Sequence, residues 1–159
     1  MMNKCHLLVC LLLVGDYSYA NDCNPAPRNV AKLEAISSSW HTVKGDLAEF
    51  NICDRSVTFD RPSIVEKPAL MIIVHGGGGR GKDVETAAYY FQKLGMATLI
   101  FDSYQMNNLT MGYRFFLSQV TNEARQRMIF KVTYSAYAWA LQQKNIDVNR
   151  IYFWGVSNG

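Results

Sequence analysis

Continuous runs of apolar residues, rather than alternating ones, dominate the second half of this chain. Three of them, at 69–74, 96–101 and 151–154, are typical of strands that are covered on both faces. Two longer segments carry apolar residues at helical spacing, one over 83–95 with its N-cap at the first position and one over about 122–143. This alternation of strand and helix predicts an α/β domain of three layers, αβα, with a mostly parallel sheet.

The first half of the chain is less regular. Pro25 and Pro27 lie in a polar segment that predicts an extended entry into the domain. Residues 47–53 and 56–59 alternate loosely between apolar and polar side chains, which predicts an antiparallel hairpin before the parallel strands. The polar stretch over 102–121 is expected to form a loop or an insertion.

The N-terminus has the features of a secretory signal peptide over residues 1–20. Lys4 gives a positive start, residues 7–14 are apolar, and Ser18-Tyr19-Ala20 is a small-x-small cleavage site. The apolar run is too short to span a bilayer comfortably, so no stable membrane insertion is expected after cleavage. We therefore predict a secreted or periplasmic protein with a mature domain over 21–159. A retained N-terminal anchor is the alternative.

The charge of the mature chain argues against one class of partner. Lys4 and Asp16 both fall in the leader, so the net charge stays at +3 after its removal. That charge is too mild and too dispersed for a nucleic-acid surface, which needs a clustered basic face. No nucleic-acid partner is expected.

Two cysteines remain outside the leader, Cys23 and Cys53. In an exported protein these two side chains are candidates for a disulfide that ties the N-terminal segment to an early strand. Two free thiols are the alternative, because pairing does not follow from sequence.

The strongest chemical motif is Gly155-Val156-Ser157-Asn158-Gly159, which follows the apolar run 151–154 directly. A G-x-S-x-G sequence after a buried strand is typical of a nucleophile elbow, a sharp turn that presents a serine at the end of a strand. The flanking glycines are needed because a Cβ at these positions would collide with the turn. We predict Ser157 as a nucleophile; a structural turn serine is the alternative.

A second glycine cluster, residues 75–79, follows the first apolar run. Backbone N–H groups that are fixed around a developing oxyanion stabilise the charge of an acyl-transfer intermediate, and glycines leave those groups accessible. Gly77 and Asn158 are the predicted oxyanion donors, while His75, Gly76 and Gly78 are expected to shape the loop. A phosphate-binding loop is disfavoured because Lys82 is followed by aspartate rather than by serine or threonine.

His75 and Asp102 are not predicted to be catalytic, although both are polar residues at strand ends. His75 opens the glycine loop, so its ring is expected to form hydrogen bonds that shape the loop. Asp102 is expected to anchor a loop, because the triad acid of a nucleophile-elbow enzyme follows the serine in the chain. Arg80 and Lys82 are expected to be solvated loop charges, with attraction of an anionic substrate as the alternative.

Residues 70–79, the strand end Phe101-Asp102-Ser103 and residues 149–159 together resemble the dienelactone hydrolase-like branch of the α/β-hydrolase superfamily. The resemblance covers about 69–159 and is most specific at the two glycine motifs. It implies a triad of serine or cysteine, aspartate and histidine, without a metal or an organic cofactor. Matched residue by residue, it implies Ser157 as the nucleophile and Gly77 and Asn158 as oxyanion donors. The best-known members carry cysteine at the position of Ser157, so a general ester is the expected substrate.

These observations predict a serine hydrolase that acts on small carboxylic esters through an acyl-enzyme. A peptidase or acyltransferase on the same fold, and a secreted non-catalytic binding module, are the alternatives. The acid and histidine of the triad follow the serine in such enzymes, so the chain is expected to be the N-terminal part of a truncated α/β-hydrolase domain and close to inert alone. Residues 21–159 in isolation are expected to be insoluble or molten.

Overall fold

The structure is a computed structural model that describes residues 17–18, 50–107, 122–157 and 159. Its strands and helices, in chain order, are β1 (Tyr17–Ser18), β2 (Val57–Pro62), β3 (Leu70–Val74), α2 (Lys82–Lys93), β4 (Ala97–Phe101), α3 (Ser103–Met106), α5 (Asn122–Ala140) and β5 (Ile151–Gly155). The predicted α/β class is confirmed.

One mixed sheet forms the centre of the molecule, with the strand order β1-β2-β4-β3-β5. The strands β4, β3 and β5 are parallel, whereas β2 runs antiparallel to β4 and the two-residue β1 runs antiparallel to β2. β3 is the central strand of the parallel part, with Ile72 opposite Leu99 of β4 and Phe153 of β5. All three parallel strands point the same way, so their carboxyl ends meet at one edge of the sheet.

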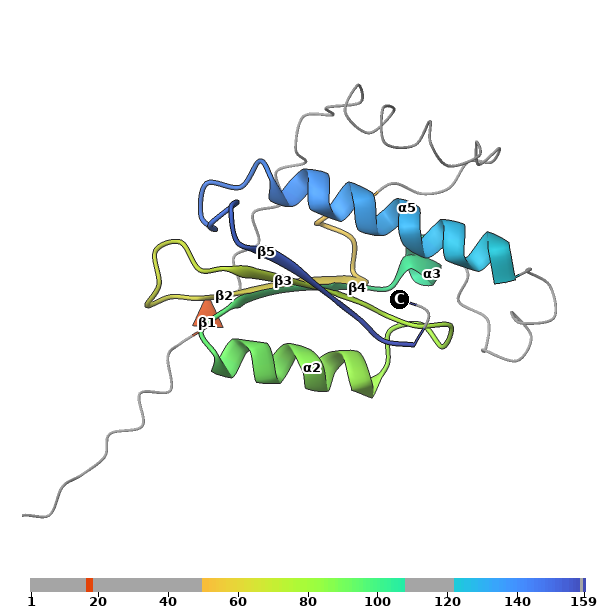
Figure 1. The fold of residues 1–159 in the computed structure, drawn as a ribbon, viewed down its shortest axis with the longest axis horizontal. Coiled ribbons are helices and arrows are strands. Elements are labelled where there is room, and N and C mark those ends of the chain that lie inside the picture. Colours follow the sequence, from red (N-terminus) through yellow and green to blue (C-terminus); the bar gives the residue numbers. More distant parts are fainter. Residues whose placement is uncertain (1–16, 19–49, 108–121, 158) are drawn as a thin grey trace, which may run out of the picture.

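Helices cover both faces of the sheet, as the three-layer prediction requires. Figure 1 shows α5 along one face and α2 along the other. Under α5 lies the larger core, which includes Ile72, Leu99 and Trp139, and under α2 lies a smaller one around Ile73 and Val84. Successive residues of β3 enter the two cores alternately, because side chains of a strand point to opposite faces. This is why β3 has no polar residue.

Two expectations about the first half were wrong. Residues 50–55 form turns rather than the first strand of a hairpin, because Asp54 accepts hydrogen bonds from both the backbone N and the Oγ of Ser56. The antiparallel partner of β2 is β4, a strand distant in sequence. Residues 47–49 of the expected hairpin lie outside the described residues.

Two further differences concern helix α2 and strand β5. The N-cap of α2 is Gly81 and not Asp83, whose Oδ1 instead accepts a hydrogen bond from Val84 N at 3.0 Å inside the first turn. β5 was expected to be covered on both faces, yet its aromatic residues are about half exposed, Phe153 at 50%. The physical reason is position: among the described residues β5 pairs with β3 alone and forms the edge of the sheet.

Most of the predicted signal peptide lies outside the described residues, which include only Tyr17 and Ser18 of it. Its cleavage therefore stays a prediction. None of the helices that the structure describes is long and apolar enough to cross a membrane.

Candidate active site

The residues after β5 form a sharp turn at the carboxyl edge of the sheet. Val156 N still donates to Val74 O at 3.0 Å, so the parallel pairing continues to this point. Ser157 then adopts a φ of 57°, the one positive φ of a non-glycine residue among those described, and its side chain is exposed. Gly159 N closes the turn with a hydrogen bond to Val156 O at 3.0 Å. A serine in left-handed conformation at the tip of a strand has the geometry of a nucleophile elbow.

The two glycine-rich bends lie in direct contact. A Cβ placed on Gly76 would stand 2.6 Å from Val156 O and 2.9 Å from the Cβ of Ser157. A Cβ on Gly159 would in turn stand 2.5 Å from Val74 O. All three distances are shorter than any that a Cβ atom tolerates. The glycines are therefore required by the close approach of the two backbones, and the structure brings the loop after β3 and the turn after β5 together.

Residues 76–79 fold into a tight turn of their own. Gly79 N donates to Gly76 O at 3.1 Å, and Gly79 has a φ of 81°, which only glycine adopts without strain. Gly77 is half-buried and Gly78 is exposed at the tip. The Gly77 N–H finds no acceptor among the described residues. A donor of this kind is available to a ligand.

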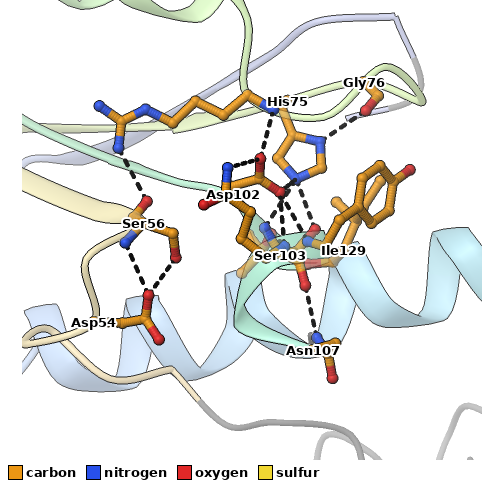
Figure 2. A network of polar contacts seen from close by, with 12 residues as sticks. Asp54, Ser56, His75, Gly76, Asp102, Ser103, Asn107 and Ile129 are labelled. Atoms are coloured by element: carbon orange, nitrogen blue, oxygen red, sulfur yellow. Dashed lines mark hydrogen bonds and ion pairs between the residues drawn. The ribbon is translucent and has the colours of Figure 1, made fainter. Parts of the chain in front are cut away.

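His75 is fully buried behind this turn and connects it to the end of β4 (Figure 2). Its Nδ1 lies 2.7 Å from Gly76 O, and its Nε2 lies 3.0 Å from Ser103 N and 2.7 Å from Ser103 Oγ. The ring of Tyr104 packs edge-on against the imidazole at 4.8 Å between centroids. Both ring nitrogens are thus engaged inside the protein, an arrangement that supports a loop-shaping role rather than general base catalysis.

Burial lowers the pKa of His75, since a charged imidazolium would lose its hydration there. The hydrogen bond with Gly76 O and the Asp102 carboxylate act in the opposite direction but are smaller effects. Asp102 Oδ1 lies 3.9 Å from Nε2, a distance at which it adds little direct hydrogen bonding. The ring is therefore neutral at neutral pH.

Asp102 and Arg80 hold the far side of the glycine turn. Asp102 caps α3 by accepting from Tyr104 N and Gln105 N, and its Oδ2 accepts from Arg80 N at 3.3 Å. The Arg80 guanidinium donates to Ser56 O and Thr58 Oγ1, both at 2.9 Å, and to Glu85 Oε1 at 2.7 Å. Arg80 is thus a clamp between β2 and the loop, and the expectation of a solvated charge was wrong for it. Lys82 is exposed.

Sequence reasoning missed Ser103, which is fully buried and contacts His75. The available signal was its place directly after β4, because residues at the carboxyl ends of neighbouring parallel strands share one edge of the sheet. Nothing in composition or spacing distinguishes a serine that contacts a histidine from an ordinary capping serine.

The structure brings Gly76, His75 and Ser157 together, and Gly77 and Gly78 belong to the same turn. Asn158 lies outside the described residues, as does Cys23. Cys53 is exposed. Because Cys23 lies outside the described residues, the pairing of the two cysteines stays a prediction. Among the described residues, Ser157 has no histidine or carboxylate within hydrogen-bonding or ion-pair distance, and no group of acidic, histidine or cysteine side chains could hold a metal ion.

Three solved structures that match this chain are hydrolases or esterases by name. A crystal structure named as a dienelactone hydrolase from Klebsiella pneumoniae matches with a TM-score of 0.50 and 14% identity, over 62% of this chain and 42% of that one. A crystal structure named as an acetyl xylan esterase from Bacteroides fragilis matches at a TM-score of 0.49 and 17% identity, over 65% of this chain and 35% of that one. A carboxyl esterase from the fungus Tuber melanosporum matches at 0.40 and 12%, over 80% and 46%.

No protein-family model and no curated protein matches the sequence. This chain spans less than half the length of each of the three structures. At such identities the likeness shows the fold alone, and the match to the Klebsiella structure carries it. The described part of the chain therefore has the α/β-hydrolase fold.

Proposed function

We propose that this chain supplies the nucleophile and the oxyanion loop of a serine hydrolase that acts on carboxylic esters. The observation that carries the proposal is the contact between the two bends: Gly76 lies against Val156 and Ser157, and Ser157 has the positive φ of a nucleophile elbow. A hydroxyl presented at a strand tip beside a glycine turn with an available N–H has the parts that acyl transfer requires.

In this proposal the Ser157 hydroxyl attacks the ester carbonyl, and its proton passes to a histidine that acts as general base. The carbonyl oxygen becomes an oxyanion that accepts hydrogen bonds from the N–H groups of Gly77 and Asn158. Collapse of this intermediate expels the alcohol, which takes the proton from the imidazolium, and leaves an acyl-enzyme on Ser157. Water then attacks the acyl-enzyme while the histidine takes its proton. The second tetrahedral intermediate collapses to release the acid, and the histidine returns the proton to Ser157.

We further propose that the triad acid and histidine lie in polypeptide that follows Gly159. The described residues offer Ser157 no such partner, and the similar Klebsiella structure is more than twice as long as its matched part. His75 does not fill the role, because both of its nitrogens are already engaged. The reaction needs no metal or organic cofactor. Export to the periplasm or the cell exterior, after cleavage of residues 1–20, is part of the same proposal.

The test uses the full-length protein, meaning the complete product of the gene. A fluorophosphonate probe is expected to label it at Ser157, and Ser157→Ala is expected to lose labelling and to lower the hydrolysis of p-nitrophenyl acetate by roughly three orders of magnitude or more. Ser63→Ala, which alters an exposed serine elsewhere, is the matched control and is expected to keep both the probe labelling and the ester hydrolysis. A folded protein that is never labelled at Ser157 would point to a binding module instead. Faster turnover of peptides than of esters would point to a peptidase.

A further inference from the structure

We propose that Ser103 is a positioning residue for the oxyanion loop: it fixes the tautomer of His75, and His75 in turn fixes the peptide group that carries the Gly77 N–H. The inference rests on the proposed function, since it assigns to Ser103 the orientation of one of the two oxyanion donors. Ser103 makes no contact with the reacting atoms in this scheme.

The first step is the tautomer of the His75 ring. Ser103 N lies 3.0 Å from Nε2, and a backbone N–H can only donate. Nε2 must therefore carry the lone pair, and the ring proton must lie on Nδ1. The Ser103 hydroxyl, 2.7 Å from the same nitrogen, donates to it as well. Two donors aimed at one nitrogen disfavour the other neutral tautomer and also the protonated ring.

The second step is the orientation of the Gly76–Gly77 peptide. With its proton on Nδ1, His75 donates to Gly76 O at 2.7 Å, and Gly79 N donates to the same oxygen at 3.1 Å. The peptide is planar and trans, so its N–H points opposite to its C=O. Holding Gly76 O from the His75 side therefore aims the Gly77 N–H outward from the turn. An oxyanion donor that is oriented before the reaction needs no reorganisation during it.

The third step is the rigidity of Ser103 itself. Asp102 caps the short helix α3 at which Ser103 is the first residue, and Asn107 Nδ2 donates to Ser103 O at 2.7 Å. Figure 2 shows Ser103 held between Asn107 on one side and His75 on the other. The charged and titratable groups that act on His75 are the carboxylates of Asp102 and Asp83, and neither accepts a hydrogen bond from the ring.

The central experiment compares Ser103→Ala with Ser56→Ala in the full-length protein. Both serines are buried, but the Ser56 hydroxyl donates to Asp54 and not to the loop. Ser103→Ala is expected to lower kcat for an ester roughly tenfold, a fraction of the effect of losing an oxyanion donor, with KM within about twofold. Ser103→Cys, which keeps the shape and a weak donor, is expected to fall between the two. Ser56→Ala is expected to leave kcat unchanged.

A second measurement does not depend on activity. The ¹⁵N chemical shifts of the His75 ring report which nitrogen carries the proton, and we expect a proton on Nδ1 in the wild type. In Ser103→Ala the backbone N–H of residue 103 still donates to Nε2, so we expect loss of the hydroxyl donor to appear as a shift of the Nε2 resonance. A wild-type ring with its proton on Nε2, or a Ser103→Ala protein with unchanged kcat, would overturn the inference. Absence of probe labelling in the wild type would instead refute the proposed function, and the ring spectrum would still test the link from Ser103 to Gly76.

Discussion

Strands β3 and β5 lie side by side in parallel register, and both consist almost entirely of apolar residues. Every residue of β3 is buried, whereas Tyr152, Phe153 and Trp154 of β5 are about half exposed. β3 has a strand on each side and a helix over each face, while β5 is the edge strand of the described sheet. A continuous apolar run thus predicts a strand whose burial is favourable. It does not predict how many neighbouring strands and helices cover that strand.

The largest expected effect concerns the central strand. Ile72→Ala, at a fully buried position of β3, is expected to lower the free energy of unfolding of the full-length protein by about 3 kcal/mol, because it removes three carbon atoms and leaves a cavity. Phe153, opposite Ile72 on the same face, is the comparison position. Phe153→Ala is expected to lower the free energy of unfolding by about 1 kcal/mol, because only about half of this residue is buried. Urea unfolding measures both.

Two outcomes would change this picture. If Ile72→Ala lowers the free energy of unfolding by less than an ordinary surface substitution does, the packing of β3 in the larger core is contradicted. A Phe153→Ala cost equal to that of Ile72→Ala would show that polypeptide outside the described residues covers β5, and the comparison between the strands would then hold only for the part described.

A second prediction concerns the bare edge. Residues 21–159 in isolation are expected to self-associate, because β5 pairs with β3 alone among the described residues and carries exposed aromatic side chains along that edge. Tyr152→Lys introduces a charge on this edge and is expected to shift the sedimentation profile toward monomer. Tyr90→Lys, at an aromatic residue of α2 that is even more exposed than Tyr152, is the control and is expected to leave association unchanged. Equal effects of the two substitutions would locate the association elsewhere.

The smallest expected effect concerns the residues at the carboxyl ends of the two strands. His75 follows β3 and has a lowered pKa because it is buried, whereas the exposed Ser157 follows β5 and does not titrate near neutrality. The unfolded chain takes up a proton on this histidine as pH falls through about 6.5, while the folded protein does not. The contribution of His75 to the free energy of unfolding is therefore expected to be constant above this pH and to decline below it. His75→Gln is expected to remove that part of the decline, as urea unfolding at a series of pH values would measure.

The sequence predicted the parallel strands and two long helices well, because their patterns are local. Apolar runs mark β3, β4 and β5, and helical spacing marks α2 and α5. The partner of β2 was not predictable in this way, since its pairing with β4 joins residues far apart in the chain. The Asp54 turn was hidden for a different reason: one short side chain redirected a segment whose apolar pattern favoured a strand.

The candidate site was predictable as a pair of motifs but not as a network. The glycines around Gly76 and Ser157 are visible because close backbone approach leaves glycine as the tolerated residue, which gives a clear signature. The contacts of Ser103 and Arg80 leave no such signature, because serine and arginine suit many surroundings. Their partners, His75 for Ser103 and Ser56 for Arg80, follow only from the order of the strands in the sheet.

The left-handed backbone of Ser157 has a consequence for the history of such a chain. A side chain in this conformation carries strain on the order of 1–3 kcal/mol, which glycine would relieve. Relief of this strain favours replacement of the serine, and under the proposed function the requirement for its hydroxyl opposes that drift. Under the same proposal, a lineage that no longer used the hydroxyl would be expected to acquire glycine here and to become more robust to heat as it did so.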